Sequence, residues 1–172
     1  MATLTTDGRA RVLNDGNEMP LLGLGVWQVK EGDETYNSVR WALELGYRHI
    51  DTAQAYGNEE SVGRAVKDSG IDRDEIFLTT KCPAEVKDAG GARRAFERST
   101  AALDLGAVDL YLIHAPWPWD AMGTDHRAGN IEVWKVFEEL YDQGRAMLLE
   151  AGYRQVSLRM FRRGASAERT SW

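Results

Sequence analysis

Residues 46–63 read GYRHIDTAQAYGNEESVG, and this stretch joins a short apolar strand to an amphipathic helix. The segment RHIDT (48–52) has the length and composition of a buried strand, and EESVGRAVKDSG (59–70) has helical spacing. Asp51 lies at the end of the strand, and Tyr56 follows in the connecting loop. Because loops at strand ends carry binding and catalytic groups, the stretch indicates a site as well as a fold unit.

The same strand-then-helix unit recurs on both sides of this stretch. Strands are predicted at 21–27, 48–52, 75–81 and 108–115, and helices at 33–46, 59–70, 89–106 and 130–144. Such alternation is typical of a parallel sheet with right-handed crossovers. Ahead of the first unit, RVLNDGNEMP (11–20) places Asn-Asp-Gly between short flanks and predicts a β-hairpin.

Both an open doubly wound sheet and a closed barrel produce this alternation. Asp51, Lys81 and His114 lie at or near the C-terminal ends of successive predicted strands, one βα unit apart. In a barrel those ends converge on one mouth, where active sites are built. The sequence therefore favours an α/β fold of the parallel (β/α) TIM-barrel type. A complete barrel takes about 250 residues, so we expect only the first four βα units, a half barrel.

The composition changes after Gly144. Residues 145–172 contain six arginines, two glutamates and no lysine, in a chain whose net charge is −6. The segment QVSLRMF (155–161) alternates polar and apolar residues, which does not suit a parallel strand covered on both faces. We therefore predict two regions, a half barrel over residues 1–144 and a poorly ordered, Arg-rich atypical tail over residues 145–172.

Two hypotheses account for this tail. A frameshift or internal deletion would have replaced the second half of the barrel, leaving a truncated chain. Alternatively the tail is a native terminus, and half barrels self-associate through the exposed edge of the fourth strand, because an unpaired edge is otherwise an aggregation hazard.

Charge and composition restrict the partners. The acidic chain, with a pI near 5.1, argues against nucleic-acid binding and favours small molecules. No apolar run approaches membrane-spanning length, no secretory signal is recognisable, and the single Cys82 suits a reducing compartment, so we expect a cytoplasmic protein with no membrane partner. His49, His114 and His126 are scattered, and no metal site is expected.

Four polar side chains suit acid–base chemistry at a carbonyl oxygen. The pKa of a tyrosine is ordinarily near 10, and an ammonium such as Lys81 beside Tyr56 would stabilise the phenolate and make the hydroxyl a better acid. Asp51 would pair with the lysine, while His114 would donate a hydrogen bond to the substrate. Each residue alone also has a structural reading, the aspartate as a helix cap for example. A Schiff-base lysine in an aldolase-like barrel is a further alternative, which borohydride trapping would detect.

The stretch 46–63 resembles the signature of the aldo-keto reductases at seven positions: Gly46, Tyr47, Arg48, Asp51, Ala53, Glu59 and Gly63. MPLLGLGVW, FLTTK and DLYLIH continue the resemblance in order, over roughly residues 10–145. The resemblance implies a (β/α)8 barrel that reduces aldehydes and ketones with NADPH, which leaves as NADP+. It implies that Tyr56 is the proton donor, Lys81 and Asp51 the pair that tunes it, and His114 the residue that orients the carbonyl.

The resemblance also implies where the cofactor and the substrate bind. Gly25, Val26, Trp27 and Asp51 match the segments that contact the cofactor, and Trp27 and Trp117 are expected to line the substrate pocket. Many members have Trp directly after the catalytic His, whereas this chain has Ala115. No counterpart is found for the family's later strands, which hold the nicotinamide amide and the 2′-phosphate. The alternative to an active reductase is therefore a non-catalytic half-barrel fragment.

Overall fold

The structure is a computed structural model that describes residues 3–4, 8–13, 16–150, 153–155 and 161–163. The chain divides into two compact units. One unit is Pro20–Phe137, and the other combines Met1–Met19 with Glu138–Trp172.

The unit Pro20–Phe137 is built on a four-stranded parallel sheet. Its strands are β4 (Leu24–Gly25), β5 (His49–Asp51), β6 (Phe77–Cys82) and β7 (Leu110–Ile113). Their order in the sheet is β4-β5-β6-β7, the same as their order along the chain. Each crossover therefore moves to the next strand in one direction, whereas a doubly wound sheet reverses direction at a switch point. The predicted half barrel of four βα units is confirmed.

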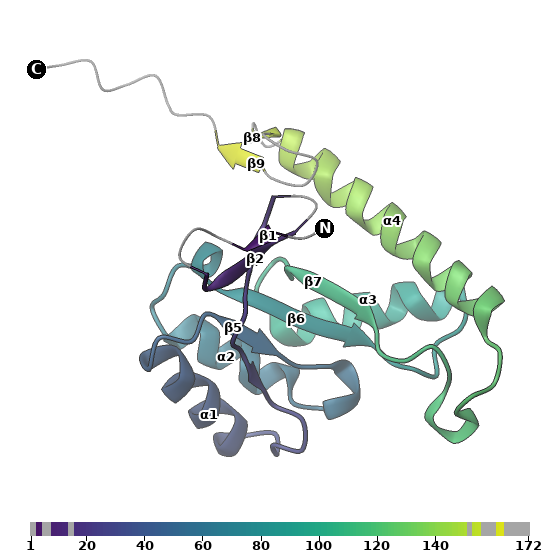
Figure 1. Cartoon of the computed structure of the whole chain (residues 1–172), viewed down its shortest axis with the longest axis horizontal. Coiled ribbons are helices and arrows are strands. Elements are labelled where there is room, and N and C mark those ends of the chain that lie inside the picture. Colours follow the sequence, from purple (N-terminus) through teal and green to yellow (C-terminus); the bar gives the residue numbers. More distant parts are fainter. Residues whose placement is uncertain (1–2, 5–7, 14–15, 151–152, 156–160, 164–172) are drawn as a thin grey trace, which may run out of the picture. The chain divides into compact units, whose positions relative to one another are not determined.

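A helix follows each strand at its predicted place (Figure 1). The four are α1 (Asp33–Glu44), α2 (Glu59–Asp68), α3 (Ala89–Leu103) and α4 (Arg127–Glu150). Three single-turn 3-10 helices lie between these elements: η1 (Gln54–Tyr56), η2 (Arg73–Glu75) and η3 (Trp119–Ala121). The first predicted strand, 21–27, shrinks to two residues, because Leu21 and Leu22 are exposed and lie outside the ladder.

The core lies between the helices and one face of the sheet. Ile50 and Leu78 from the strands meet Val39, Leu43 and Val62 from the helices, and all five are almost completely buried. The other face of the strands presents alternate residues, because successive side chains in a strand point to opposite sides. The sheet therefore has one packed face and one face on which polar groups can be placed.

Gly63 explains how closely α2 approaches α3. A Cβ atom at this position would come within 2.0 Å of the backbone oxygen of Leu103, at the end of α3. No side chain can occupy that space, so the glycine sets the distance between the two helices.

Helix α4 is longer than predicted. Among its described side chains the buried ones are Val133 and Val136, and the rings of Trp134 and Phe137 lie 6.2 Å apart. The helix begins at Arg127 instead of 130 and ends at Glu150 instead of 144. No helix in the described part of the chain has the length and hydropathy needed to cross a membrane.

The second unit contains the short strands near the two ends of the chain. β1 (Thr3–Leu4), β2 (Ala10–Val12) and β3 (Glu18–Pro20) form a sheet in that order, and the β2–β3 pair is the predicted hairpin. β8 (Tyr153–Gln155) and β9 (Phe161–Arg163) pair antiparallel. Between them, 156–160 of the segment QVSLRMF lie outside the described residues, as do 164–172. The domain boundary at 144 and the poor order of the tail stay predictions.

Candidate active site

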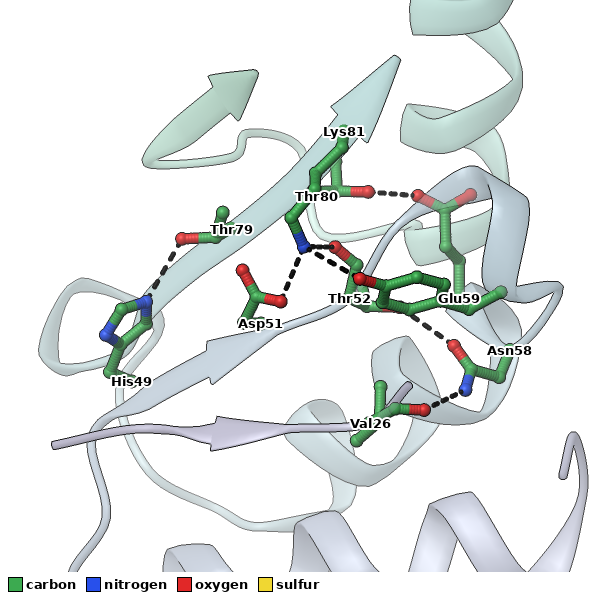
Figure 2. Close-up of polar contacts among 10 residues, drawn as sticks. Val26, His49, Asp51, Thr52, Asn58, Glu59, Thr79, Thr80 and Lys81 are labelled. Atoms are coloured by element: carbon green, nitrogen blue, oxygen red, sulfur yellow. Dashed lines mark hydrogen bonds and ion pairs between the residues drawn. The ribbon is translucent and has the colours of Figure 1, made fainter. Parts of the chain in front are cut away.

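Lys81 is the centre of a polar cluster on the open face of the sheet. Its neighbour Thr80 points the other way, toward Glu59 of α2, so alternation directs Lys81 away from the helices. The Lys81 Nζ donates hydrogen bonds to Asp51 Oδ1 at 2.5 Å and to the backbone oxygen of Thr52 at 2.8 Å (Figure 2). A third contact, at 3.4 Å, joins Nζ to the hydroxyl of Tyr56. One ammonium thus touches both the carboxylate and the phenol that the sequence singled out.

The position of Tyr56 is set by the short helix η1. Its backbone N–H donates to the oxygen of Ala53, and the next residue, Gly57, turns the chain with a φ of 67°. This left-handed conformation favours glycine, which carries no Cβ. The Lys81 Nζ also lies 5.0 Å from the centroid of the Tyr56 ring. The phenol is therefore next to a positive charge at the end of a tight turn.

Asn58 holds this turn in place, and sequence reasoning missed it. The Thr52 hydroxyl donates to Asn58 Oδ1 at 2.8 Å, and Asn58 Nδ2 donates to the backbone oxygen of Val26 at 2.9 Å (Figure 2). The same Nδ2 donates to the backbone oxygen of Val29, also at 2.9 Å. Asn58 is completely buried and ties the loop after β5 to the loop after β4. The position of Asn58 next to Gly57 is the one feature of the sequence that points to this role. The same position fits a helix cap equally well.

His114 completes the cluster from the end of β7. Its backbone N–H donates to Cys82 O at 3.1 Å, which continues the pairing of β7 with β6. The His114 and Tyr56 rings are 5.5 Å apart in an edge-to-face arrangement. Burial, and next to it the positive charge of Lys81, lowers the pKa of His114 below its usual value near 6.5. The imidazole is therefore mostly neutral at pH 7, and its Nδ1 is buried with no hydrogen-bond partner among the described residues.

Trp119, in the loop after β7, is the tryptophan that contacts His114. Their rings are 5.4 Å apart and nearly perpendicular, and Trp119 remains largely exposed. Trp117, which the sequence assigned to the substrate pocket, is half-buried, and its role stays a prediction. The turn at η3, which begins at Trp119, brings this indole to the histidine.

The residues predicted for the cofactor lie beside Asp51. Gly25 is directly opposite Asp51 in the register of β4 and β5, and the Val26 N–H donates to the Asp51 backbone oxygen at 3.0 Å. Val26 is buried, whereas Trp27 is 68% exposed. A Cβ atom at Gly25 would meet no atom within 4 Å, so the backbone there is open to a flat group. The assignment of Gly25, Val26, Trp27 and Asp51 to the cofactor stays a prediction.

Two other ionisable groups lie behind the site. Glu59 is almost completely buried and accepts a hydrogen bond from the Thr80 hydroxyl at 2.6 Å, and burial raises its carboxyl pKa. Burial also raises the pKa of the Cys82 thiol. His49, on the open face, contacts the Thr79 hydroxyl at 3.1 Å (Figure 2). Within the described residues, no three His, Cys, Asp or Glu side chains are grouped to hold a metal ion.

Comparison with known proteins agrees with this architecture. Residues 21–149 match the model of the aldo/keto reductase family. The chain is 46% identical over 132 residues to methylglyoxal reductase of Escherichia coli (strain K12), and 44% identical over 133 residues to glyoxal reductase of Bacillus subtilis (strain 168). These alignments cover 77% of this chain and 44% and 45% of the two relatives.

Solved structures give the same result. An aldo/keto reductase from Brucella melitensis superposes with a TM-score of 0.68 at 46% identity, covering 78% of this chain and 49% of that one. An aldo-keto reductase from Bombyx mori in complex with NADP has a TM-score of 0.65 at 36% identity, covering 77% and 46%. The chain therefore spans less than half the length of these relatives.

Fold and site together define an α/β barrel-type protein with Asp51, Tyr56, Lys81 and His114 clustered at its strand ends. The chain belongs to the aldo/keto reductase family.

Proposed function

We propose that this protein reduces the carbonyl group of small aldehydes or ketones to an alcohol, with NADPH as the hydride donor and Tyr56 as the proton donor. The observation that carries the proposal is the position of the Lys81 Nζ, in contact with both Asp51 and Tyr56. Relatives named as methylglyoxal and glyoxal reductases support a small carbonyl substrate.

The Lys81–Asp51 pair places a positive charge beside the Tyr56 hydroxyl, 3.4 Å from the Lys81 Nζ. The ammonium there would offset negative charge that develops on the phenol oxygen while the proton passes to a substrate oxygen. The Asp51 carboxylate accepts a hydrogen bond from the same Nζ at 2.5 Å and holds it in place. Because Lys81 donates to both Asp51 and Thr52, it is poorly placed to act as a Schiff-base nucleophile, and the reductase reading is favoured.

His114 positions the substrate carbonyl. A neutral imidazole carries one N–H, which donates a hydrogen bond without competing to supply the proton. The low pKa of His114 keeps it in this form. Since Nδ1 is buried, Nε2 is the nitrogen that would meet the carbonyl oxygen, next to the Tyr56 hydroxyl.

Gly25, Val26, Trp27 and Asp51 would hold the nicotinamide end of NADPH. When bound, the cofactor supplies the hydride that the carbonyl carbon receives. The open space over Gly25 and the exposed indole of Trp27 give the ring a flat surface beside Asp51. The Bombyx mori relative in complex with NADP supports NADPH as the cofactor.

A second candidate function is a non-catalytic half-barrel fragment. It is favoured by the openness of the site, where Trp27 is 68% exposed and the Asp51 side chain 33% exposed. Hydride transfer benefits from exclusion of water, and water can reach both of these side chains.

Titration of the purified chain with NADPH, followed by quenching of tryptophan fluorescence, separates the two candidates. Saturable quenching that is reduced in Trp27→Phe, with turnover of methylglyoxal, is the result expected of a reductase. A folded chain with neither quenching nor turnover would overturn the enzymatic proposal and leave the fragment reading.

A further inference from the structure

Asn58 lies at the start of α2, yet its side chain does not cap the helix. The backbone oxygen of Asn58 accepts from the Val62 N–H at 3.2 Å, as the oxygen of a capping residue does. Asparagine is common at this position because its side-chain oxygen can accept from the N–H groups of the first turn. Among the residues that the structure describes, the Asn58 side chain makes no such bond. Its amide is directed to other segments of the chain.

Glu31 supplies the cap that Asn58 does not. The Ser61 N–H, in the first turn of α2, donates to Glu31 Oε2 at 3.4 Å, and the Ser61 hydroxyl donates to Glu31 Oε1 at 2.5 Å. A carboxylate is favourable at this end of a helix, because it accepts from free N–H groups and lies at the positive end of the helix dipole. The start of α2 is therefore satisfied from the loop between β4 and α1, and the helix does not require the side chain of Asn58.

The amide of Asn58 instead holds the β-turn formed by residues 26–29. The Val29 N–H donates to the Val26 oxygen at 3.2 Å and closes this turn, with Trp27 and Gln28 at its centre. Gln28 has a φ of 65°, a left-handed conformation that is unfavourable for residues other than glycine and persists where surrounding contacts hold it. Asn58 Nδ2 supplies such contacts, because it donates at 2.9 Å to the backbone oxygen at each end of the turn. The exposed Trp27 is thus presented by a turn that is fixed from inside the protein.

The oxygen of the same amide holds the strand end that supports Lys81. The Thr52 hydroxyl donates to Asn58 Oδ1 at 2.8 Å, and the Thr52 backbone oxygen accepts from the Lys81 Nζ at 2.8 Å (Figure 2). Thr52 and Asn58 are both completely buried, and a buried hydrogen bond is stronger than one in water. Three hydrogen bonds, joined through Thr52 and Asn58, therefore link the Lys81 ammonium to the backbone of Val26.

The partners of the amide determine which residue can stand at position 58. Backbone carbonyls only accept hydrogen bonds, so the NH2 group faces Val26 and Val29 and the oxygen faces the Thr52 hydroxyl. Both N–H donors of Asn58 are used in this arrangement. An aspartate has the same shape but no donor when ionised, so it would turn an oxygen toward two carbonyl oxygens. Both loops therefore keep their places only with a neutral amide between them.

We propose that Asn58 is a positioning residue that fixes the turn presenting Trp27 relative to the contact between Thr52 and Lys81, and through Lys81 relative to the Tyr56 hydroxyl. A change at Thr52 is then felt at Trp27. Trp27 belongs to the predicted cofactor and substrate surface, and Tyr56 is the proposed proton donor. One buried amide thus keeps the hydride side and the proton side of the reaction at a fixed distance from each other, a consequence that rests on the proposed function.

Fluorine NMR of the cofactor-free chain labelled with 5-fluorotryptophan tests this role. The chain has six tryptophans, and Trp27→Phe identifies the Trp27 resonance by its loss. In Asn58→Asp the released turn is expected to shift or broaden this resonance, while Trp41 on α1 keeps its wild-type resonance. Asn130→Asp is the matched control, because it removes an amide that donates to the backbone oxygen of Pro116 at 2.8 Å and is expected to leave Trp27 unchanged.

Thr52→Val separates positioning from a merely structural role, and it decides the test if Asn58→Asp does not fold. The variant removes only the hydroxyl that holds Asn58 Oδ1, and it is expected to move the Trp27 resonance by a smaller amount. A merely structural role would lower the unfolding free energy of both variants but leave the Trp27 resonance of the folded chain unchanged. An unchanged Trp27 resonance in folded Thr52→Val or folded Asn58→Asp would overturn the proposal.

Kinetics with NADPH and methylglyoxal measure the consequence for the reaction. Asn58→Asp retains every residue proposed to touch cofactor or substrate, yet misplacement of these residues is expected to lower kcat/KM by about 10²-fold. Wild-type kcat/KM in this variant would overturn the proposal. A wild-type chain without turnover, in which Thr52→Val still moves the Trp27 resonance, would overturn the proposed function and support the role of Asn58.

Discussion

The two central strands of the sheet and its two edge strands differ in how many neighbouring strands they have. β5 and β6 in the centre have neighbours on both sides and lie against α2 and α3, and they carry Asp51 and Lys81. β4 and β7 at the edges carry the residues predicted to meet the cofactor and the substrate. The difference teaches that the Asp51–Lys81 pair is held by strands with a neighbour on each side, while the residues predicted to bind cofactor and substrate follow strands with one free edge among the described residues.

The largest effect is expected from Tyr56→Phe, which removes the hydroxyl next to Lys81. Loss of a general acid lowers kcat by about 10²- to 10⁴-fold, and quenching by NADPH should stay unchanged because the ring remains. Steady-state kinetics with methylglyoxal measure the effect. Tyr36→Phe, which removes a hydroxyl on the surface between α1 and α2, is the control. Near-normal turnover by Tyr56→Phe would exclude Tyr56 as the donor.

Core truncation in the centre should cost more stability than truncation at an edge. Ile50→Ala in β5 removes a completely buried side chain, with an expected loss of about 2–5 kcal/mol of unfolding free energy. Leu45→Ala at the edge should change the unfolding free energy of the monomer by less than about 0.5 kcal/mol. Urea unfolding at low protein concentration measures both. Equal losses would contradict the contrast between centre and edge.

Gly63→Ala tests how closely α2 and α3 must pack in the centre of the unit. The new methyl group would clash with the backbone oxygen of Leu103, so α2 and α3 must separate, at a cost of about 1–3 kcal/mol. Gly144→Ala on α4, where a Cβ would meet no atom within 4 Å, is the matched control and should be neutral or slightly stabilising. If Gly63→Ala unfolds at the wild-type urea concentration, the close helix approach is not required.

The smallest effect is expected from the titration of His114. Its pKa is lower in the folded than in the unfolded chain, so between these two values the unfolded chain binds more protons. His114 therefore favours folding fully above about pH 6.5, and this contribution is lost as the pH falls through its folded pKa. Urea unfolding over about pH 5–8 measures the unfolding free energy of wild type and of His114→Asn. As the pH falls, this free energy should decrease less steeply in the variant than in the wild type. His126→Asn is the control, and an equal change in slope there would contradict the assignment.

Much of the half barrel and of the cluster follows from local pattern alone. The strand and helix periods predicted four βα units because each element repeats its apolar residues at its own spacing. Asp51, Lys81 and His114 could be grouped in advance, since parallel strands point their carboxyl ends to one edge. Tyr56 could be grouped with them for the same reason, because it lies in the loop that follows β5.

Only the tertiary structure decided the contacts that link distant loops. Buried Asn58 joins the β5 loop to the β4 loop, Trp119 contacts His114 from the loop after β7, and burial raises the pKa of the Cys82 thiol. None of these follows from spacing, because each depends on where another segment of chain packs. Local periodicity is sufficient to place a residue on a strand end, but its partner is determined by the packing of the whole unit.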